Sequence, residues 1–80
     1  MDLPKLEPGK RYVIHSRGAS SAVRDIAYDT DKRELEIEYP SGERYAYQKV
    51  PPEEFLGLLQ SDSIGTYVNQ HIKRYLYRRL

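Results

Sequence analysis

Residues 34–39, Glu-Leu-Glu-Ile-Glu-Tyr, alternate strictly between acidic and apolar side chains. Successive side chains of a β-strand point to opposite faces, so this pattern predicts a strand with one apolar and one acidic face. Such a strand buries its apolar side against a second layer of structure and leaves its glutamates toward solvent. The segment therefore predicts a sheet that is covered on one face.

Two neighbouring segments, residues 23–29 and 43–50, carry weaker forms of the same alternation. Turn-forming residues separate the three segments, at 29–32 before the central strand and at 40–42 after it. Short strands joined by tight turns form antiparallel meanders. The sequence therefore predicts three antiparallel strands in chain order.

The length of the second turn decides which face the tyrosines of residues 44–47, Arg-Tyr-Ala-Tyr, occupy. A two-residue loop at Ser41-Gly42 would place both tyrosines on the glutamate face. We favour a three-residue loop that includes Pro40, because it suits a type I turn with a left-handed glycine and matches side chains across the strands. The expected pairs are Tyr45 with Ile37, Tyr47 with Leu35, and Arg44 with Glu38. Both tyrosines are then mainly core residues rather than an exposed platform for stacking bases.

Two helices are predicted after the sheet. The first begins at Pro52, a residue suited to the first helical position, and its apolar face consists of Phe55, Leu58 and Leu59. The second begins after Ser61 or Ser63 and runs to about residue 74. Its apolar stripe consists of Ile64, Tyr67, Val68, Ile72 and Tyr75. The predicted fold is α+β, a three-stranded antiparallel β-meander packed against two C-terminal helices.

Residues 1–19 are weakly patterned, with prolines and a glycine that favour an extended chain. We expect them to form a weakly ordered leader before a domain of residues 20–80. Within the leader, residues 11–15, Arg-Tyr-Val-Ile-His, are suited to a short strand at one edge of the sheet. Residues 16–22 are small and polar, which predicts a loop.

The chain has 80 residues, no cysteine, and no apolar run near the roughly 20 residues that a membrane span needs. Disulfides and thiolate metal sites are therefore excluded, and the first residues lack the apolar core of a signal peptide. We expect one small, soluble, cytoplasmic domain that does not bind membranes.

Catalytic chemistry is not evident in the sequence. His15 and His71 are the only histidines, no cysteine is present as a nucleophile, and no histidine pair has the spacing of metal ligands. Asp29 and Asp31 are spaced like the start of a calcium loop, but no glycine or distal glutamate completes it. We therefore expect no enzyme activity, no catalytic or metal-binding residues, no cofactor and no small-molecule substrate.

Positive charge is concentrated at the C-terminal end. Residues 1–67 hold nine Lys or Arg against twelve Asp or Glu, a net charge of −3, whereas residues 68–80 hold four cations and no acid, a net charge of +4. The four cations are Lys73, Arg74, Arg78 and Arg79. A basic end of this kind favours a phosphate-bearing or acidic partner, although a solvated helix face and tail would carry the same charges.

Four segments, in order, resemble the KTSC domain, which is named for the C-terminus of certain lysyl-tRNA synthetases. They are residues 20–29 (SSAVRDIAYD), 35–47 (LEIEYPSGERYAY), 50–59 (VPPEEFLGLL) and 63–80 (SIGTYVNQHIKRYLYRRL). Members of that family occur as small bacterial or phage proteins and as appendages of the synthetases, and RNA binding has been proposed for them. By analogy, the resemblance implies a role with RNA.

The motif Arg-Tyr-x-Tyr of residues 44–47 recurs at residues 74–77, where the predicted second helix ends. This second copy has too few neighbours to be fully buried. The chain that follows it can extend the helix or fold back as an edge strand, and a functional and a structural interpretation of it are equally supported.

Three functions remain open. The favoured one, through the resemblance, is nucleic-acid binding by the basic C-terminal end, with RNA preferred to DNA. The expected site residues are Lys73, Arg74, Arg78 and Arg79, which would neutralise phosphates, and Tyr77, which would stack on a base. The second is a protein-interaction or adaptor module that uses the basic tail or the acidic sheet face of Glu34, Glu36 and Glu38. In the third, residues 76–80 only complete the core.

Overall fold

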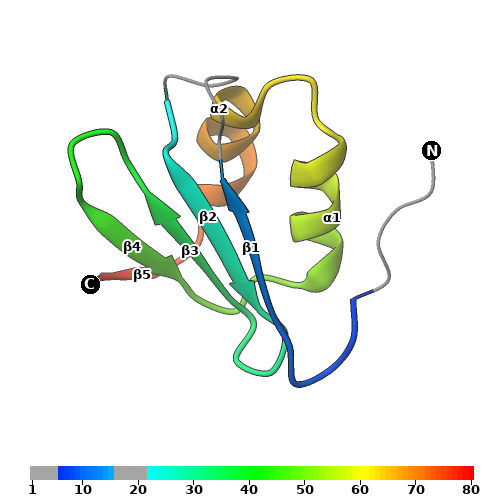
Figure 1. The fold of residues 1–80 in the computed structure, drawn as a ribbon. Coiled ribbons are helices and arrows are strands. Elements are labelled where there is room, and N and C mark those ends of the chain that lie inside the picture. The colour runs from blue at the N-terminus through cyan, green and yellow to red at the C-terminus, as the bar shows by residue number, and fades with distance from the viewer. Residues whose placement is uncertain (1–5, 16–21) are drawn as a thin grey trace.

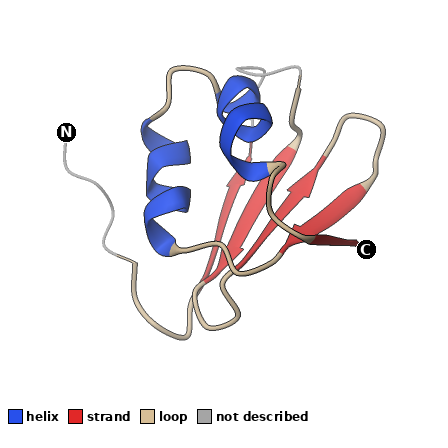
Figure 2. Ribbon diagram, turned by 180° about the vertical axis from the view of Figure 1, so that it is seen from behind, coloured by secondary structure: helices blue, strands red, loops and turns tan. Residues whose placement is uncertain are grey.

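The computed structural model describes residues 6–15 and 22–80. They form a five-stranded antiparallel sheet in the order β1-β2-β3-β4-β5, with the helices packed against one face (Figures 1 and 2). The elements are β1 (Arg11–His15), β2 (Asp25–Asp29), β3 (Glu34–Glu38), β4 (Arg44–Tyr47), α1 (Pro52–Gln60), α2 (Ile64–Tyr67), the π-helix η1 (Val68–Ile72) and β5 (Tyr77–Arg79). The α+β class is as predicted. The prediction of three strands is wrong, because β1 and β5 extend the meander at its two edges.

The predicted register between β3 and β4 is confirmed. The observed pairs include Tyr45 with Ile37, Tyr47 with Leu35, and Arg44 with Glu38. In the turn, the Gly42 N–H donates to the Tyr39 carbonyl over 2.8 Å, and Gly42 has a φ of 92°. The last residue of the three-residue loop is therefore in the left-handed conformation, which glycine adopts at the lowest energetic cost.

Strand β1 lies at one edge of the sheet and pairs with β2, from Arg11 opposite Asp29 to His15 opposite Asp25. The chain before it is held by the turn after β2, because the Asp31 carboxylate accepts a hydrogen bond of 2.9 Å from the Gly9 N–H. Most of the loop predicted for residues 16–22 lies outside the described residues.

Strand β5 forms the other edge, so the C-terminal end folds back beside β4 rather than extending a helix. Main-chain hydrogen bonds flank the paired residues, from the Gln48 N–H to the Leu76 carbonyl (2.7 Å) and from the Leu80 N–H to the Arg44 carbonyl (2.9 Å). Residues 76–80 are all exposed. They therefore add an edge strand to the sheet but contribute no buried side chain to the core. The third functional interpretation required these residues to complete the core.

The predicted second helix begins where expected but differs in form. The Ser63 hydroxyl accepts a hydrogen bond of 3.3 Å from the Thr66 N–H and caps α2. After one turn the helix widens into η1, in which the Lys73 N–H donates to the Val68 carbonyl over 3.0 Å, five residues back. The helix thus ends at Ile72 rather than near residue 74. This early end leaves the chain free to cross to the sheet edge before β5.

The core fills the space between the sheet and the helices. Its buried members are Val23, Ile26, Tyr28, Leu35, Ile37, Tyr47, Val50, Phe55, Leu58, Val68 and Ile72. The rings of Tyr28 and Phe55 stack with centroids 4.9 Å apart, and the Tyr28 hydroxyl donates to the Val50 carbonyl over 2.6 Å. Burial raises the pKa of Tyr28 to about 12. This phenol therefore remains a neutral hydrogen-bond donor under physiological conditions.

Candidate functional site

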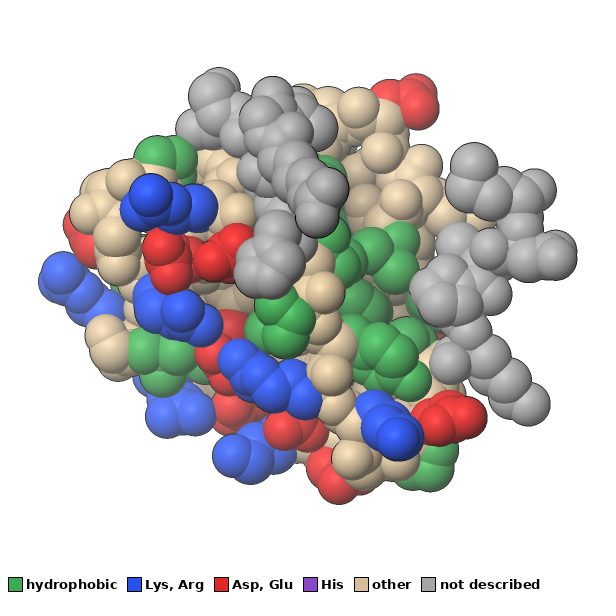
Figure 3. Space-filling model, viewed as in Figure 1, with side chains coloured by type: hydrophobic (Ala, Val, Ile, Leu, Met, Phe, Trp, Pro, Cys, Tyr) green, Lys and Arg blue, Asp and Glu red, His purple; other side chains and the backbone are tan. Residues whose placement is uncertain are grey.

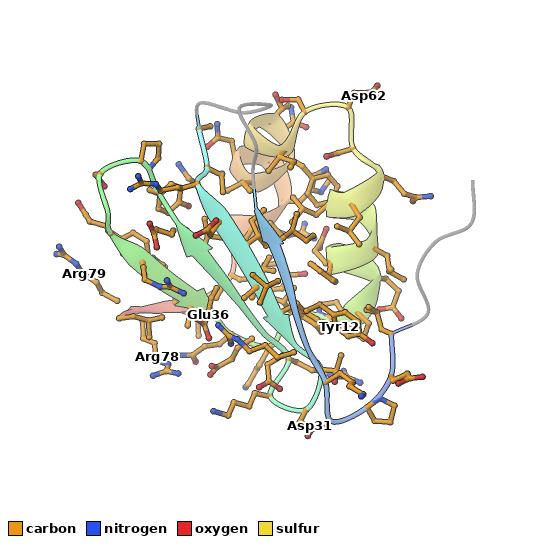
Figure 4. All side chains as sticks on the ribbon, viewed as in Figure 1. Tyr12, Asp31, Glu36, Asp62, Arg78 and Arg79 are labelled. Atoms are coloured by element: carbon orange, nitrogen blue, oxygen red, sulfur yellow. The ribbon has the colours of Figure 1, made fainter. Side chains whose placement is uncertain are left out.

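The C-terminal strand separates residues that the sequence had grouped together. Tyr77 lies opposite Tyr47 and Arg79 lies opposite Tyr45, so both occupy the face of the sheet that carries the helices, here called the helix side. Arg78, between them, lies opposite Ala46 on the other face, here called the open face. Figure 4 shows Arg78 and Arg79 projecting in different directions from β5.

The predicted cations also have different partners. Arg78 pairs with Glu34 at 3.0 Å on the open face, and Arg74 pairs with Glu54 of α1 at 3.3 Å. On the helix side, Arg79 lies 3.7 Å from Glu43, and the Lys73 ammonium lies 5.7 Å from the centroid of the Tyr39 ring. Of the five predicted site residues, Lys73 and Tyr77 line one pocket on the helix side. Arg79 is on the same face, next to Glu43 of that lining, whereas Arg74 and Arg78 lie elsewhere.

The glutamates of β3, predicted as an acidic sheet face, are neutralised by arginines on the open face. Glu36 makes a two-pronged pair with Arg11, with N–O distances of 2.8 and 3.0 Å, and Arg44 bridges Glu36 and Glu38. Positive and negative side chains accordingly alternate over the sheet in Figure 3. The hydrogen bonds from Arg11 lower the pKa of Glu36, against the opposing effect of burial. This face offers little unpaired negative charge to a basic partner.

A pocket opens on the helix side, where the helices end short of the strands β3 to β5. It has a volume of about 480 Å³. It is lined by Tyr39, Ser41, Glu43, Tyr45, Tyr47, Lys73 and Tyr77, and is called here the tyrosine pocket. The lining comes from the β3–β4 hairpin, from the residue after η1 and from the start of β5. The two Arg-Tyr-x-Tyr motifs meet here, because Tyr47 and Tyr77, the last residue of each motif, are paired across β4 and β5.

The four tyrosines form a wall that runs from the core to solvent. Tyr47 is 4% exposed and lies at the inner end, whereas Tyr77 is 58% exposed and lies at the mouth. The Tyr45 ring meets the Tyr77 ring edge-on at 5.2 Å and the Tyr39 ring edge-on at 5.6 Å. Edge-on packing of this kind holds each ring in one orientation. The exposed part of Tyr77 therefore projects from a supported cluster of rings.

Hydrogen bonds orient the polar edges of this wall. The Tyr39 and Tyr47 hydroxyl groups share a hydrogen bond of 2.8 Å, and the Tyr45 hydroxyl donates to the Glu43 carboxylate over 2.5 Å. Burial, together with the bond to Tyr47, raises the pKa of Tyr39, and the bond to Glu43 raises the pKa of Tyr45. Both phenols therefore stay neutral, and Glu43 is the acidic group of the pocket.

The sequence interpretation missed this pocket because it assigned Tyr39, Tyr45 and Tyr47 to the core face as a group. That assignment holds for Tyr47, but Tyr39 and Tyr45 are only partly buried. The missing information is the pairing of β5 with β4, which brings Tyr77 beside Tyr45 and Tyr47. The recurrence of Arg-Tyr-x-Tyr was the one signal in the sequence that pointed to this pocket. The sequence analysis did not predict that the two copies would lie on paired strands.

Glu54 of α1 anchors the chain that leads from the helices to the pocket. Its carboxylate, 11% exposed, accepts hydrogen bonds from the hydroxyl groups of Tyr67 (2.6 Å) and Tyr75 (2.7 Å) and pairs with Arg74. Burial acts to raise the pKa of Glu54, but these hydrogen bonds outweigh it, and the net pKa is lowered. Glu54 thereby fixes the segment on which Lys73 lies.

Substitution Glu54→Gln is expected to lower the free energy of unfolding at neutral pH by about 1–2 kcal/mol, because charge-assisted hydrogen bonds become neutral ones. A carboxyl group with a lowered folded pKa stabilises the fold above its unfolded pKa of about 4.3, and that contribution is lost as the pH falls through the folded value. The variant should therefore lose less stability than the wild type below about pH 4.3. Urea denaturation followed by circular dichroism across pH measures both effects.

The matched control for this substitution is Glu53→Gln, which removes the same charge from the exposed neighbouring position of α1. It should change the unfolding free energy by less than about 0.5 kcal/mol. Equal effects of the two substitutions would contradict the anchoring role of Glu54.

Two absences hold for residues 6–15 and 22–80. No three His, Asp or Glu side chains there are grouped so that they could share a metal ion. No helix in the same residues combines the length and the apolar character needed to cross a membrane.

Comparison with known proteins identifies the family. The KTSC domain model matches residues 19–77. An uncharacterized protein of Stutzerimonas stutzeri is 44% identical over 59 residues, which cover 74% of this chain and 83% of that protein. A protein of Tsukamurella paurometabola is 39% identical over 54 residues, which cover 68% of this chain and 81% of that protein.

The fold has a counterpart in the crystal structure of a KTSC domain protein from Yersinia pestis. The two superpose with a TM-score of 0.80 at 28% sequence identity, over 89% of this chain and 99% of that one. The sequence and structure matches together show that the chain belongs to the KTSC domain family.

Proposed function

We propose that this protein is a non-catalytic module that binds single-stranded RNA, with a base in the tyrosine pocket and the adjoining phosphates on Lys73 and Arg79. The observation that carries the proposal is the grouping of four tyrosine rings with two cations on the helix side of the sheet. Proteins bind single strands by stacking bases on aromatic side chains and by placing cations along the backbone. The pocket supplies both elements from one continuous surface.

The charge of the pocket favours an anionic ligand. Lys73 in the lining contributes one positive charge, and the negative charge of Glu43 is balanced by Arg79, which lies 3.7 Å from it. A cage of tyrosines without these cations would suit a cationic ligand through cation–π contacts, but the Lys73 ammonium already lies near the Tyr39 ring. A ligand with a flat ring and a phosphate matches both the rings and the net charge.

A single strand fits this site better than a duplex. The tyrosines lie in a pocket, and a base can reach them only when it is free of its complementary strand. The open face adds no basic surface for a duplex to rest on, since Arg11, Arg44 and Arg78 are paired with glutamates. RNA is favoured over DNA through the KTSC family, and the cytoplasm as the place of action belongs to the same proposal.

Fluorescence anisotropy with labelled single-stranded RNA across a salt series tests the proposal. Two phosphate contacts predict a log–log slope of affinity against salt of about −1.4, at about 0.7 for each contact with a single strand. The same measurement with single-stranded DNA and with duplex RNA should show weaker binding. Absence of binding to single-stranded RNA even at low salt would remove the proposal.

Substitution Arg79→Ala is expected to weaken RNA binding by about three- to tenfold and to reduce the magnitude of the salt slope by about 0.7, because one phosphate contact is lost. Arg78→Ala is the matched control, since it removes the same side chain from the adjacent residue on the opposite face. It should leave the affinity and the slope unchanged. Equal losses for both variants would show that the tail acts as a diffuse charge rather than through the pocket.

Protein interaction is the second candidate, and the uncovered face of the sheet is the feature that favours it. A basic partner would have to displace the arginines that pair with Glu34, Glu36 and Glu38. The cost of breaking those pairs makes this surface a weaker candidate than the tyrosine pocket. Pull-down experiments that recover the same partner with wild type and with Tyr77→Ala would support it.

A further inference from the structure

Glu43 differs from the glutamates of β3 in where it lies. Glu34, Glu36 and Glu38 lie on the open face, where arginines pair with them. Glu43 lines the tyrosine pocket instead, beside the rings on which a base would stack. A carboxylate is an unusual lining group for a site that binds a phosphate-bearing strand, because it repels the backbone. Besides its contacts with Tyr45 and Arg79, this carboxylate has the capacity to accept hydrogen bonds from a base.

The Glu43 carboxylate is held in place by its neighbours. One of its oxygens, Oε2, accepts the hydrogen bond from the Tyr45 hydroxyl and lies 3.7 Å from a guanidinium nitrogen of Arg79. The Tyr45 ring is itself fixed by edge-on contacts with Tyr39 and Tyr77. An ionised carboxylate accepts hydrogen bonds at about four lone-pair sites, so one phenol does not exhaust its capacity. Glu43 is thus an oriented acceptor at the edge of a stacking surface.

The pocket also contains the opposite kind of group. The Lys73 ammonium has only donors, and it lies near the Tyr39 ring in the same lining. A base that fills the pocket therefore meets a pure acceptor and a pure donor. The bases of RNA differ in how well their edges match such a pair.

Guanine has the matching edge. Its Watson–Crick edge carries two adjacent N–H donors, at N1 and N2, beside the O6 acceptor, and single-stranded RNA is recognised through edges of this kind. Two parallel N–H groups can bind one carboxylate in the forked geometry that makes such contacts strong. Adenine and cytosine present one amino donor next to an acceptor, and uracil presents one N–H between two acceptors. Only guanine can place two neighbouring donors on a carboxylate and an acceptor toward an ammonium.

We infer that the tyrosine pocket selects guanine, with Glu43 accepting from N1–H and N2–H of the base and Lys73 donating to its O6. This inference rests on the proposed RNA-binding function and specifies its ligand. Stacking on tyrosine is tolerant of sequence because every base has a π-face, so it supplies affinity without selection. Selection then depends on the single carboxylate of the pocket.

The test uses fluorescein-labelled oligouridine RNAs that carry one central guanine, inosine, adenine, cytosine or uracil. A bidentate contact with a base is worth about 1–3 kcal/mol of discrimination, so the guanine RNA should bind about tenfold more tightly than the adenine, cytosine and uracil RNAs. Inosine keeps N1–H and O6 but lacks the N2 amino group. The inosine RNA should therefore bind with an affinity between those of the guanine and adenine RNAs.

Glu43→Gln should reduce the ratio of the guanine to the uracil affinity from about ten to about one, because the forked carboxylate acceptor is lost. The affinity for the uracil RNA should rise, because a charge that repels the phosphates is removed while the ring wall and the cations remain. The substitution keeps an oxygen that can accept from Tyr45, and circular dichroism checks that the variant is folded. Glu53→Gln, on the exposed side of α1, removes the same charge away from the pocket and should keep the preference.

The outcomes separate the inference from the proposed function. Binding of all five RNAs with equal affinity, lost on Tyr77→Ala, would overturn guanine selection and leave RNA binding in the pocket standing. A guanine preference that survives Glu43→Gln would also overturn the inference. Failure of every RNA to bind would overturn both.

Discussion

Replacing Phe55 with alanine is expected to lower the free energy of unfolding by about 3–5 kcal/mol, the range for removal of a buried aromatic side chain. Phe55 is 1% exposed, and its ring stacks on Tyr28 at 4.9 Å with an angle of 13° between the planes. Together with Leu58, which is also 1% exposed, it fixes α1 to the core above the sheet. At about 0.05–0.15 kcal/mol per residue, a domain of 80 residues has a total stability of about 4–12 kcal/mol, so this one substitution should remove a large fraction of it.

Urea denaturation followed by far-ultraviolet circular dichroism measures this change. The midpoint urea concentration should fall, with little change in the slope of unfolding free energy against urea. The control is Leu76→Ala, which also removes a large apolar side chain but from a position that is 76% exposed. That substitution should alter the unfolding free energy by no more than about 0.5 kcal/mol. Similar losses for the two variants would mean that α1 does not pack on β2 as described.

Replacing Tyr77 with alanine is expected to weaken the binding of single-stranded RNA by about 5- to 150-fold, because stacking of one base on an aromatic side chain is worth about 1–3 kcal/mol. Tyr77 is the most exposed of the four tyrosines in the pocket, and its ring is supported from behind by Tyr45 and Tyr47. No other tyrosine of the pocket offers as much exposed ring surface. Fluorescence anisotropy at constant salt gives the change in dissociation constant directly.

The variant should remain folded, since β5 is held to β4 by main-chain hydrogen bonds that do not involve the Tyr77 side chain. Tyr77→Phe keeps the ring and removes only the hydroxyl group, and its affinity should stay within about threefold of wild type. Leu80→Ala, a change at an exposed apolar residue just beyond β5, should have no effect. Wild-type affinity in Tyr77→Ala would exclude stacking on this ring.

The two largest effects concern different layers of the molecule. Phe55 acts through the core between the helices and the sheet, whereas Tyr77 lies beyond the end of the helices, at the edge of the same sheet. If Tyr77→Ala loses RNA binding at normal stability, and Phe55→Ala loses stability, then folding depends on the core and does not depend on the side chains of the pocket.

The meander and its register followed from the sequence because they depend on local rules. Alternation in residues 34–39 sets which side chains share a face, and the turn at residues 40–42 sets which of them are paired across the hairpin. Both rules act over a few residues and need no knowledge of the rest of the chain. The α+β class and the buried positions of Phe55 and Leu58 followed in the same way, whereas the sequence left Ser61 and Ser63 as alternative N-caps and the structure shows Ser63.

The site required the tertiary structure. A three-residue strand such as β5 carries too little pattern to be recognised, and its pairing with β4 joins residues that are about thirty positions apart in the chain. That pairing places Arg79 on the helix side and Arg78 on the open face, a distinction that a count of charges cannot make. The widening of the helix into η1, with its end at Ile72, was likewise not visible in the sequence pattern.

The sequence by itself thus determined the central strands, their register, the start of the first helix and the basic character of the C-terminal end, because each depends on residues that are close together in the chain. Only the tertiary structure decided that the two Arg-Tyr-x-Tyr motifs meet, that the acidic sheet face is neutralised by arginines, and that Lys73, Tyr77 and Arg79 share one side of the sheet. Those outcomes depend on pairing between strands that are far apart in the chain and on how the helices lie over the sheet. Both are set by the packing of the whole domain.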